Sequence, residues 1–235
     1  LFSQLDISYI ATDYAELDIT NQDALNNFFK GKKFDYIINC AAYNDVDKAE
    51  DDIDNCFELN AKAPVYLATI AKNLQAVYVT YSTDFVFDGK KNAPYTEEDV
   101  PNPLSVYAKS KLEGEHGVLQ IYDKVFVIRT SWLFGIAGKN FNTQVLGWAQ
   151  NRSELAIVDD QISAPTYAKD LAYFSWKLMQ TQKYGLYHFS NEGIASKYDQ
   201  AEYLLKKVGW DGVLKRAKTA DFAVKAKRPP YSKID

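Results

Sequence analysis

The sequence predicts an α/β fold, a Rossmann-like doubly wound parallel sheet followed by a smaller C-terminal α/β region. Short apolar runs typical of buried strands alternate with helical patterns of ten or more residues. Polar residues follow several of these strands at the point where each one ends. The 235 residues are 47% hydrophobic, which is enough for a large core and argues against disorder.

The first half of the chain supplies most of the predicted sheet. Residues 1–5 resemble the end of a helix, and 7–11 form a short predicted strand that ends at Asp13. Thr20 is the expected N-cap of the next helix. Strands connected by helices form right-handed crossovers, so the strands should be parallel and covered on both faces. The remaining strands are predicted at 34–40, 77–81 and 125–128, and the helices at 21–30, 53–73 and around Tyr107.

The pattern changes beyond about residue 140. We divide the chain into a nucleotide cofactor-binding domain at 1–140, N-terminally truncated, and a mainly substrate-binding region at 141–235 that is interleaved with it. In the second part we expect helices at 140–151, 168–180 and from Ser196 or Lys197 onward, and strands at 155–158 and 185–189.

A dinucleotide-binding domain usually begins with a strand and a Gly-rich turn that places the pyrophosphate at a helix N-terminus. The first glycine of this sequence is Gly31, so the N-terminal Gly-rich βα element is missing. We expect that the sequence begins just after that element.

Composition excludes several functions. The formal net charge of −4 gives no basic surface for nucleic acid, and no apolar run approaches the ~20 residues that span a bilayer. Cys40 and Cys56 lack metal or redox spacing, which favours a reduced, cytoplasmic compartment. His116 and His188 have no metal-ligand spacing, so we predict no metal site; a Mg²⁺ requirement is not readable from the sequence.

Four of the predicted strands end in polar or small residues. In open parallel sheets, ligands bind beyond the carboxyl ends of the strands. Any one of these segments could be an ordinary turn, but together they predict one crevice. The strand-end segments are Asp13, 41–42, 82–83 and 130–132.

Thr83, Tyr107 and Lys111 form the predicted catalytic set. Tyr107 and Lys111 are one helical turn apart and share a face. A Thr hydroxyl can hydrogen-bond a carbonyl oxygen, a Tyr can donate a proton, and a Lys can stabilise the resulting tyrosinate. An isolated Tyr has a pKa near ~10, so proton transfer near neutrality needs such a positive neighbour.

The same Tyr-Lys spacing occurs twice more, at Tyr173 and Lys177 and at Tyr203 and Lys207. Both pairs lie in ordinary amphipathic helical patterns, and we interpret them as chance. Tyr107 differs because a proline-containing loop precedes it and a polar strand end lies upstream. The alternative for Tyr107 is a purely structural helix start.

Motifs along nearly the whole chain resemble the dTDP-4-dehydrorhamnose reductases, a family of extended short-chain dehydrogenase/reductases. The runs Thr-Ser-Trp and Ala-Pro-Thr make this resemblance more specific than Tyr-x-x-x-Lys alone. The matching segments are 18–19, 39–43, 46–50, 82–87, Tyr107 with Lys111, 129–132, 160–161, 164–166 and 228–229.

The resemblance implies reduction of the 4-keto group of dTDP-4-dehydro-6-deoxy-L-mannose to dTDP-L-rhamnose, used in cell-surface polysaccharide. Thr83, Tyr107 and Lys111 would be catalytic. NADPH or NADH would contact Asp13, Asp18, Ile19, Ala41, Ala42, Tyr43, Asn60, Tyr107 and Lys111. The dTDP-sugar would contact Thr83, Asp84, Phe85, Trp132 and Arg228.

Several alternatives stay open at this point. Tyr14 follows Asp13 where a basic residue is common, which favours NADH being accepted at least as well as NADPH. Phe85 stands where related dehydratases have a second acid, which disfavours dehydration. An epimerase or a non-catalytic regulatory subunit of the same fold is not excluded, nor is a homodimer. Arg228 could instead belong to a solvated tail.

Overall fold

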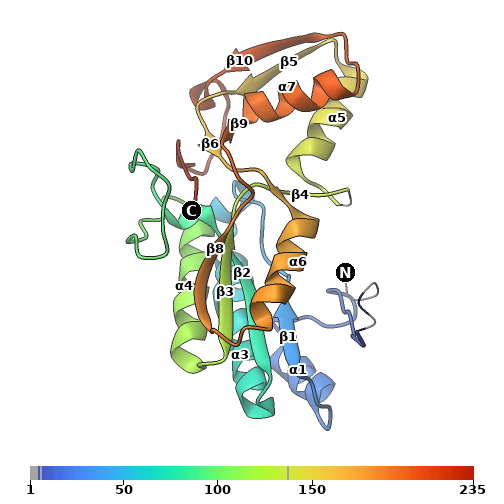
Figure 1. The fold of residues 1–235 in the computed structure, drawn as a ribbon, viewed down its shortest axis with the longest axis vertical. Helices are drawn as coiled ribbons and strands as arrows, with labels where there is room; N and C mark the ends of the chain where they lie inside the picture. The colour runs from blue at the N-terminus through green and yellow to red at the C-terminus, as the bar shows by residue number, and fades with distance from the viewer. Residues whose placement is uncertain (1–4, 6, 137) are drawn as a thin grey trace.

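The computed structural model describes residues 5, 7–136 and 138–235. Its larger part is built on a four-stranded sheet in which all neighbouring strands are parallel. Figure 1 shows this sheet with helices along it and a smaller group of elements above it. The predicted α/β fold with a parallel sheet is confirmed. The strand order is β1 (Tyr36–Asn39), β2 (Val77–Thr83), β3 (Val125–Thr130) and β8 (Gly185–Phe189).

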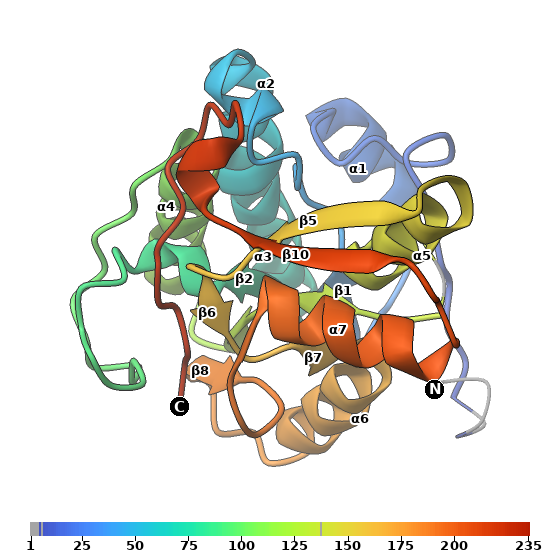
Figure 2. The ribbon, with the colours of Figure 1, turned by 90° about the horizontal axis from the view of Figure 1, so that it is seen from above.

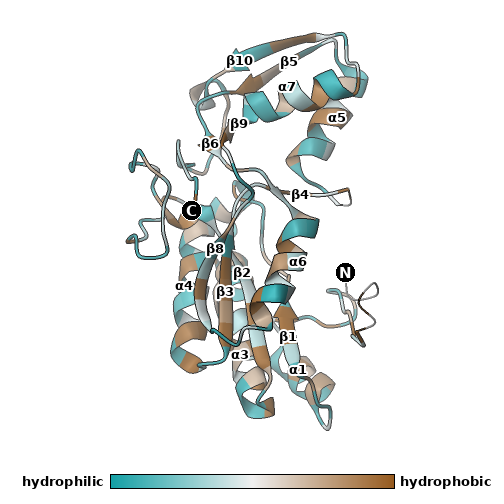
Figure 3. Ribbon diagram, viewed as in Figure 1, coloured by the Kyte–Doolittle hydropathy of each residue, from teal (hydrophilic) through white to brown (hydrophobic). Residues whose placement is uncertain are grey.

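Alternate residues of the central strands point into two separate cores. Tyr78 and Val127 pack toward one face, whereas Val79 and Ile128 pack toward the other. Figure 3 shows the apolar residues that run along these strands. The first face is covered by α1 (Gln22–Phe29), α3 (Ala63–Leu74) and α4 (Val106–Ile121), and the second by α6 (Ala168–Met179).

The helix starts follow from side-chain capping. The Asn21 side chain accepts a hydrogen bond from the Ala24 N–H and caps α1, so the predicted cap at Thr20 is wrong. The Thr20 hydroxyl instead donates to the Asp18 carboxylate at 2.7 Å. Ser105 caps α4 by accepting from the Ala108 N–H.

The long helix predicted at 53–73 is present but contains a π-helical turn. It runs through α2 (Ile53–Phe57), the π turn η3 (Glu58–Lys62) and α3. Pro64 has no N–H to donate to the Asn60 carbonyl four residues earlier, which explains the change of hydrogen-bond register there. The freed carbonyl instead lies against Gly114 of α4, where a Cβ would be only 2.2 Å from the Asn60 oxygen.

The strand predicted at 7–11 is wrong. These residues have no regular secondary structure, and no described segment pairs with them. A strand needs a neighbour for its backbone hydrogen bonds, and β1 forms the edge of the described sheet. The helix end predicted at 1–5 lies outside the described residues except for Leu5.

The smaller group of elements has its own core, formed by residues such as Val145, Leu155 and Leu205. Figure 2 looks down on it and shows β5 and β10 side by side. Strand β10 was missed by sequence reasoning because its polar residues lack an apolar run. The group contains α5 (Phe141–Asn151), β5 (Glu154–Val158), α7 (Lys197–Lys207) and β10 (Val213–Ala217).

Four two-residue strands and three short helices complete the described chain. Because α6 and β8 return to the main sheet after α5 and β5, the two parts alternate along the sequence; the domain boundary at residue 140 stays a prediction. The short elements are β4 (Leu133–Phe134), β6 (Ile162–Ser163), β7 (Thr166–Tyr167), β9 (Ala195–Ser196), η2 (Lys48–Glu50), η4 (Asp84–Val86) and η5 (Thr219–Asp221).

The C-terminal segment is packed into the molecule. Ile234 is fully buried and forms a bridge with Tyr95, and Tyr231 forms one with Ile162. This packing rules out the solvated tail considered above for the segment that contains Arg228.

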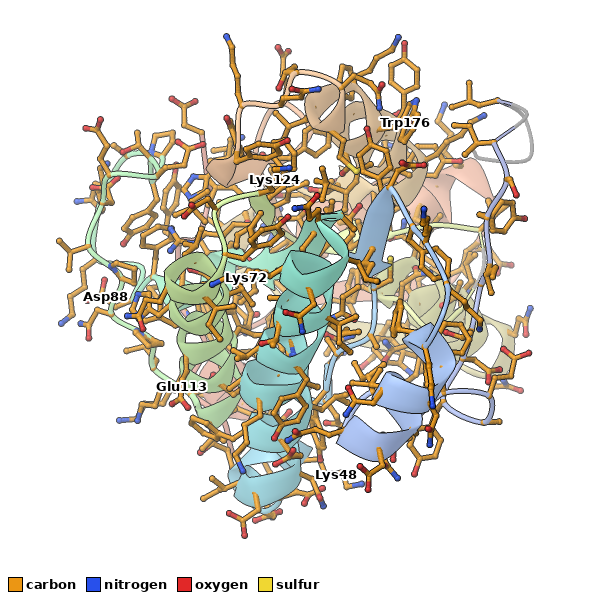
Figure 4. The ribbon with its side chains drawn as sticks, turned by 90° about the horizontal axis from the view of Figure 1, so that it is seen from below. Lys48, Lys72, Asp88, Glu113, Lys124 and Trp176 are labelled. Carbon is orange, nitrogen blue, oxygen red and sulfur yellow. The ribbon has the colours of Figure 1, made fainter. Side chains whose placement is uncertain are left out.

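Figure 4 looks at the end of the molecule where β2 and β3 begin. The Lys72 ammonium donates to the Ile121 carbonyl at 3.0 Å and joins α3 to α4. On the other face of the sheet, the Trp176 ring packs edge-on against Tyr36. This end is therefore closed by structural contacts, and the polar strand ends lie at the opposite end. No helix within the described residues is long and apolar enough to cross a membrane.

Candidate active site

The ends of β2 and β3 place the candidate site between the sheet and the smaller group of elements. Thr83 and Thr130 are neighbours in the strand register. The chain then turns at Trp132, whose φ of 43° is in the left-handed region that non-glycine residues rarely adopt. Such conformations are often found at functional sites, which makes this turn a candidate for ligand contact.

Thr83 and Tyr107 come together as the sequence predicted. Burial of the ring raises the pKa of Tyr107, and the neighbouring Thr83 side chain opposes this shift in part. The single proton of the Thr83 hydroxyl is donated to the Asp84 carboxylate at 3.2 Å. Phe85 packs edge-on against the Tyr107 ring, with centroids 6.3 Å apart.

Lys111 is buried on the same helix, and its Nζ donates to the Tyr81 carbonyl at 2.7 Å. Burial lowers the pKa of Lys111 to about 8, and the charge of Glu115 opposes this effect. Desolvation is the largest effect on the pKa of Tyr107, and the Lys111 ammonium is directed toward the Tyr81 carbonyl. The expected lowering of the Tyr107 pKa by Lys111 stays a prediction.

A buried ion pair lies one helical turn beyond Lys111. Arg129 of β3 contacts Glu115 of α4 at 2.6 Å, and both side chains are almost fully buried. The second Arg129 terminal nitrogen lies 3.3 Å from His188 Nε2. This cluster fixes α4 against β3 and β8. It could not be predicted from spacing along the sequence because its members come from three different elements.

Asp84 is a fully buried carboxylate held by hydroxyl groups. It accepts hydrogen bonds from Thr83, from Ser163 of β6 and, over a very short distance, from Ser232. Burial raises the pKa of Asp84 to about 6, and the three hydroxyl groups partly offset the effect. Its lone pairs are directed at protein groups. A contact between Asp84 and the dTDP-sugar stays a prediction.

The predicted cofactor loop at 41–43 is joined to α4 through Asn60. The Asn60 amide accepts from the Tyr43 N–H at 2.8 Å and donates to the Tyr43 carbonyl and the Ser110 hydroxyl. Ser110 in turn donates to the Tyr107 carbonyl. Asn60 therefore holds the loop beside α4, the helix that carries Tyr107 and Lys111. Ala41 is exposed and Ala42 half-buried on this loop.

The other two predicted cofactor segments make local contacts. Asp13 is exposed and accepts from the N–H groups of Ala15 and Glu16, and Asp18 accepts from Thr20. Ile19 packs against the first core. The structure does not bring these three side chains into contact with Thr83, Tyr107 or Lys111, and their cofactor role stays a prediction.

Arg228 forms a two-point ion pair with Asp47, at 2.5 and 3.2 Å. Its guanidinium holds the pKa of Asp47 below its usual range. This geometry does not test the predicted substrate role of Arg228. It shows an ion pair between two segments that are 181 positions apart in the sequence.

Sequence reasoning missed Lys197, the first residue of α7. Its Nζ lies 3.5 Å from the centre of the Trp132 ring and 4.6 Å from that of Phe141. The only sequence signal was its position just after the N-cap Ser196.

Two cavities, of about 510 and 310 Å³, are lined by other residues. The larger is a wide groove beside the stacked rings of Phe134 and Tyr167, and the smaller lies between α6 and β8. Neither is lined by Thr83, Tyr107 or Lys111. Within the described residues, no three His, Cys, Asp or Glu side chains gather as metal ligands do.

Comparison with known proteins identifies the family. The model of the RmlD substrate binding domain family matches residues 1–235. A dTDP-4-dehydrorhamnose reductase from Aggregatibacter actinomycetemcomitans is 40% identical over 96% of this chain and 81% of its own length. The spore coat polysaccharide biosynthesis protein SpsK of Bacillus subtilis is 35% identical, over 97% of this chain and 81% of its own length.

Solved structures agree with this match. A dTDP-4-dehydrorhamnose reductase from Clostridium acetobutylicum superposes with a TM-score of 0.96 and 40% identity, covering 100% of this chain and 83% of that protein. The enzyme from Bacillus anthracis, in complex with NADP, has a TM-score of 0.95 and 34% identity over 99% of this chain and 83% of its own. The protein belongs to the dTDP-4-dehydrorhamnose reductase family of Rossmann-like enzymes.

Proposed function

We propose that this protein reduces the 4-keto group of dTDP-4-dehydro-6-deoxy-L-mannose to give dTDP-L-rhamnose, with NADPH or NADH as the reductant. The observation that carries the proposal is the contact between Thr83 and Tyr107 beside the buried Lys111. Relatives at 32–40% identity bear the name of this activity. The product would supply cell-surface polysaccharide, in line with the name of the related SpsK.

The residues present fit the nicotinamide end of such a cofactor. Lys111 Nζ and Tyr107 Oη are hydrogen-bond donors suited to ribose hydroxyl groups, and the loop at 41–43 lies beside them through Asn60. The bound cofactor supplies the hydride. The Bacillus anthracis relative binds NADP, which supports NADPH; the acid at Asp13 supports acceptance of NADH as well.

The protein's own groups handle the proton and the developing charge. When the substrate binds, the Thr83 hydroxyl turns from the Asp84 carboxylate, donates its hydrogen bond to the carbonyl oxygen at C4 and polarises it. Tyr107 Oη then protonates that oxygen as negative charge develops there. The ammonium of Lys111 stabilises the tyrosinate that is left, and the Glu115–Arg129 ion pair holds the helix in place.

We further propose that the sheet domain at 1–140 binds the cofactor and that 141–235 mainly binds the sugar nucleotide. The position of Trp132 between these parts supports this division. Two free cysteines are consistent with a reducing cytoplasmic compartment. A homodimer stays a prediction.

The test is a turnover assay with the purified full-length protein, dTDP-4-dehydro-6-deoxy-L-mannose, and NADPH or NADH. We expect substrate-dependent cofactor oxidation and dTDP-L-rhamnose as the product. Cofactor binding without oxidation, or a changed sugar configuration without net cofactor consumption, would contradict a reductase and favour an epimerase or a binding subunit.

A further inference from the structure

Lys197 is placed where a positive charge does not help the fold. It is the first residue of α7, whose N-terminus is closed by a capping box between Ser196 and Asp199. A cation in the first turn opposes the helix dipole, which favours negative charge at that end. Stabilisation of α7 therefore does not explain a lysine at this position.

The Lys197 ammonium also lacks an anionic partner. Among the residues that the structure describes, no hydrogen-bond acceptor or carboxylate lies within bonding distance of its Nζ; its contacts are the faces of Trp132 and Phe141. An ammonium has three donors, and the two rings satisfy them only weakly. A half-buried lysine in this state is suited to bind an acceptor that the chain itself does not supply.

Nearby charged groups are already engaged. Asp84 is close enough to attract Lys197, but its oxygens accept from three hydroxyl groups. Arg228 is close enough to repel Lys197 and is paired with Asp47. Burial lowers the pKa of Lys197 to about 7, an effect that a bound anion would reverse.

The position of Lys197 relates it to the substrate. Trp132 follows the end of β3, and Asp84 follows the end of β2 and bonds Thr83, so the ammonium lies on the sugar-binding side of the catalytic group. We propose that Lys197 is a substrate-binding residue that pairs with the diphosphate of the nucleotide sugar, with the Trp132 ring as the surface that holds its side chain. This inference rests on the proposed function, which supplies the nucleotide sugar.

The test compares Lys197→Met with Lys197→Arg, and Lys206→Met serves as the control because Lys206 is exposed at the other end of the same helix. Methionine keeps the length and the contact with the rings but removes the charge. Two measurements are needed: steady-state kinetics with the 4-keto sugar nucleotide, and calorimetric affinity for dTDP and for thymidine.

For Lys197→Met we expect KM for the sugar nucleotide to rise about 10- to 100-fold, the usual range for a lost charge-assisted hydrogen bond, with kcat within about threefold. Affinity for dTDP should fall by a similar factor and affinity for thymidine should not change. Lys197→Arg should recover part of the loss, and Lys206→Met should behave as wild type.

Wild-type KM and dTDP affinity in Lys197→Met would overturn the proposal. An equal loss for dTDP and thymidine would also contradict it, because that result indicates a packing role in the pocket. If the unmodified protein does not turn over the sugar nucleotide, the proposed function fails instead, while selective weakening of dTDP binding in Lys197→Met would still assign the diphosphate contact.

Discussion

The buried carboxyl of Asp84 accepts a hydrogen bond from the Thr83 hydroxyl, and its titration should make the stability of the protein depend on pH. Its pKa is raised to about 6 by burial, so the folded state holds a proton at pH values where the unfolded chain has lost it. The stability of the protein should therefore decrease as pH rises from about 4 to about 6, and level off above that range.

The variant Asp84→Asn stays uncharged across this window. We expect the free energy of unfolding of the variant, minus that of the wild type, to increase between pH 4 and pH 6 by up to roughly 3 kcal/mol, because each pKa unit corresponds to ~1.4 kcal/mol. Urea unfolding at several pH values measures this difference. Asp88→Asn is the control: the pKa of Asp88 is lowered, so its stability difference should change mainly below pH 4, in the opposite direction, and stay nearly constant from pH 4 to pH 6. If the difference in unfolding free energy for Asp84→Asn does not change between pH 4 and pH 6, the raised pKa of Asp84 is contradicted.

At the level of single residues, the sequence predicted which side chains lie near one another only where the chain itself places them close together. Tyr107 and Lys111 are one helical turn apart, and Thr83 ends the strand beside them. The partners of Asp84 were not predictable, because Ser163 and Ser232 are 79 and 148 positions away. The same holds for Lys197, which meets Trp132 only through tertiary packing.

Among the secondary-structure elements, the contact of α4 with the π turn determines where Tyr107 and Lys111 lie. Gly114 permits this contact because a Cβ there would be 2.2 Å from the backbone oxygen of Asn60. The helices would have to separate to admit a methyl group, and that movement would also displace Tyr107 and Lys111 on α4.

We expect Gly114→Ala to destabilise the protein by about 1–3 kcal/mol, in the range of overpacked sites, and to lower kcat. The matched control is Gly147→Ala in α5, where a Cβ meets no atom within 4 Å. That substitution should stabilise by about 0.5–1 kcal/mol, since alanine is the better helix former. Denaturant unfolding compares the stability of the two variants. Equal changes in the free energy of unfolding would show that the close approach of Gly114 to the Asn60 carbonyl does not require a glycine.

The elements themselves were predictable to different extents. The strand at 185–189 was predicted with the bounds that the structure gives, because its apolar run is bounded by turn residues. The run at 7–11 was equally apolar but has no partner strand. Strand β10, in contrast, is polar and exists because β5 offers it a complete parallel ladder. Strand formation depends on neighbours, which a local pattern does not reveal.

Across the whole molecule, the C-terminal segment connects parts that are far apart in sequence. Arg228 pairs with Asp47, and Ser232 donates a hydrogen bond to Asp84, the residue next to Thr83. The sequence predicted that the Arg-Pro motif matters, but it left open whether the segment is packed or solvated. Only the tertiary structure answers that question.

A double-mutant cycle with Asp47→Asn and Arg228→Gln tests this connection. We expect a coupling free energy of about 0.5–1 kcal/mol, because the pair is two-pointed but partly exposed. The pKa of Asp47 is lowered, so the coupling should be present at neutral pH and disappear as acid protonates Asp47 below the usual range of an aspartate. Additive single-variant effects at neutral pH would mean that the pair does not hold the segment.

The most direct test of the central claim is the turnover number of Tyr107→Phe. This variant keeps the buried ring but removes the hydroxyl to which the proposed mechanism assigns the proton transfer. Tyr203→Phe is the matched control, because Tyr203 has the same spacing to a lysine but is 67% exposed. We predict that Tyr107→Phe lowers kcat about 10²- to 10⁴-fold and weakens cofactor affinity by about tenfold at most, the effect of one lost hydrogen bond, with Tyr203→Phe unchanged. A Tyr107→Phe variant with the wild-type kcat would contradict the account.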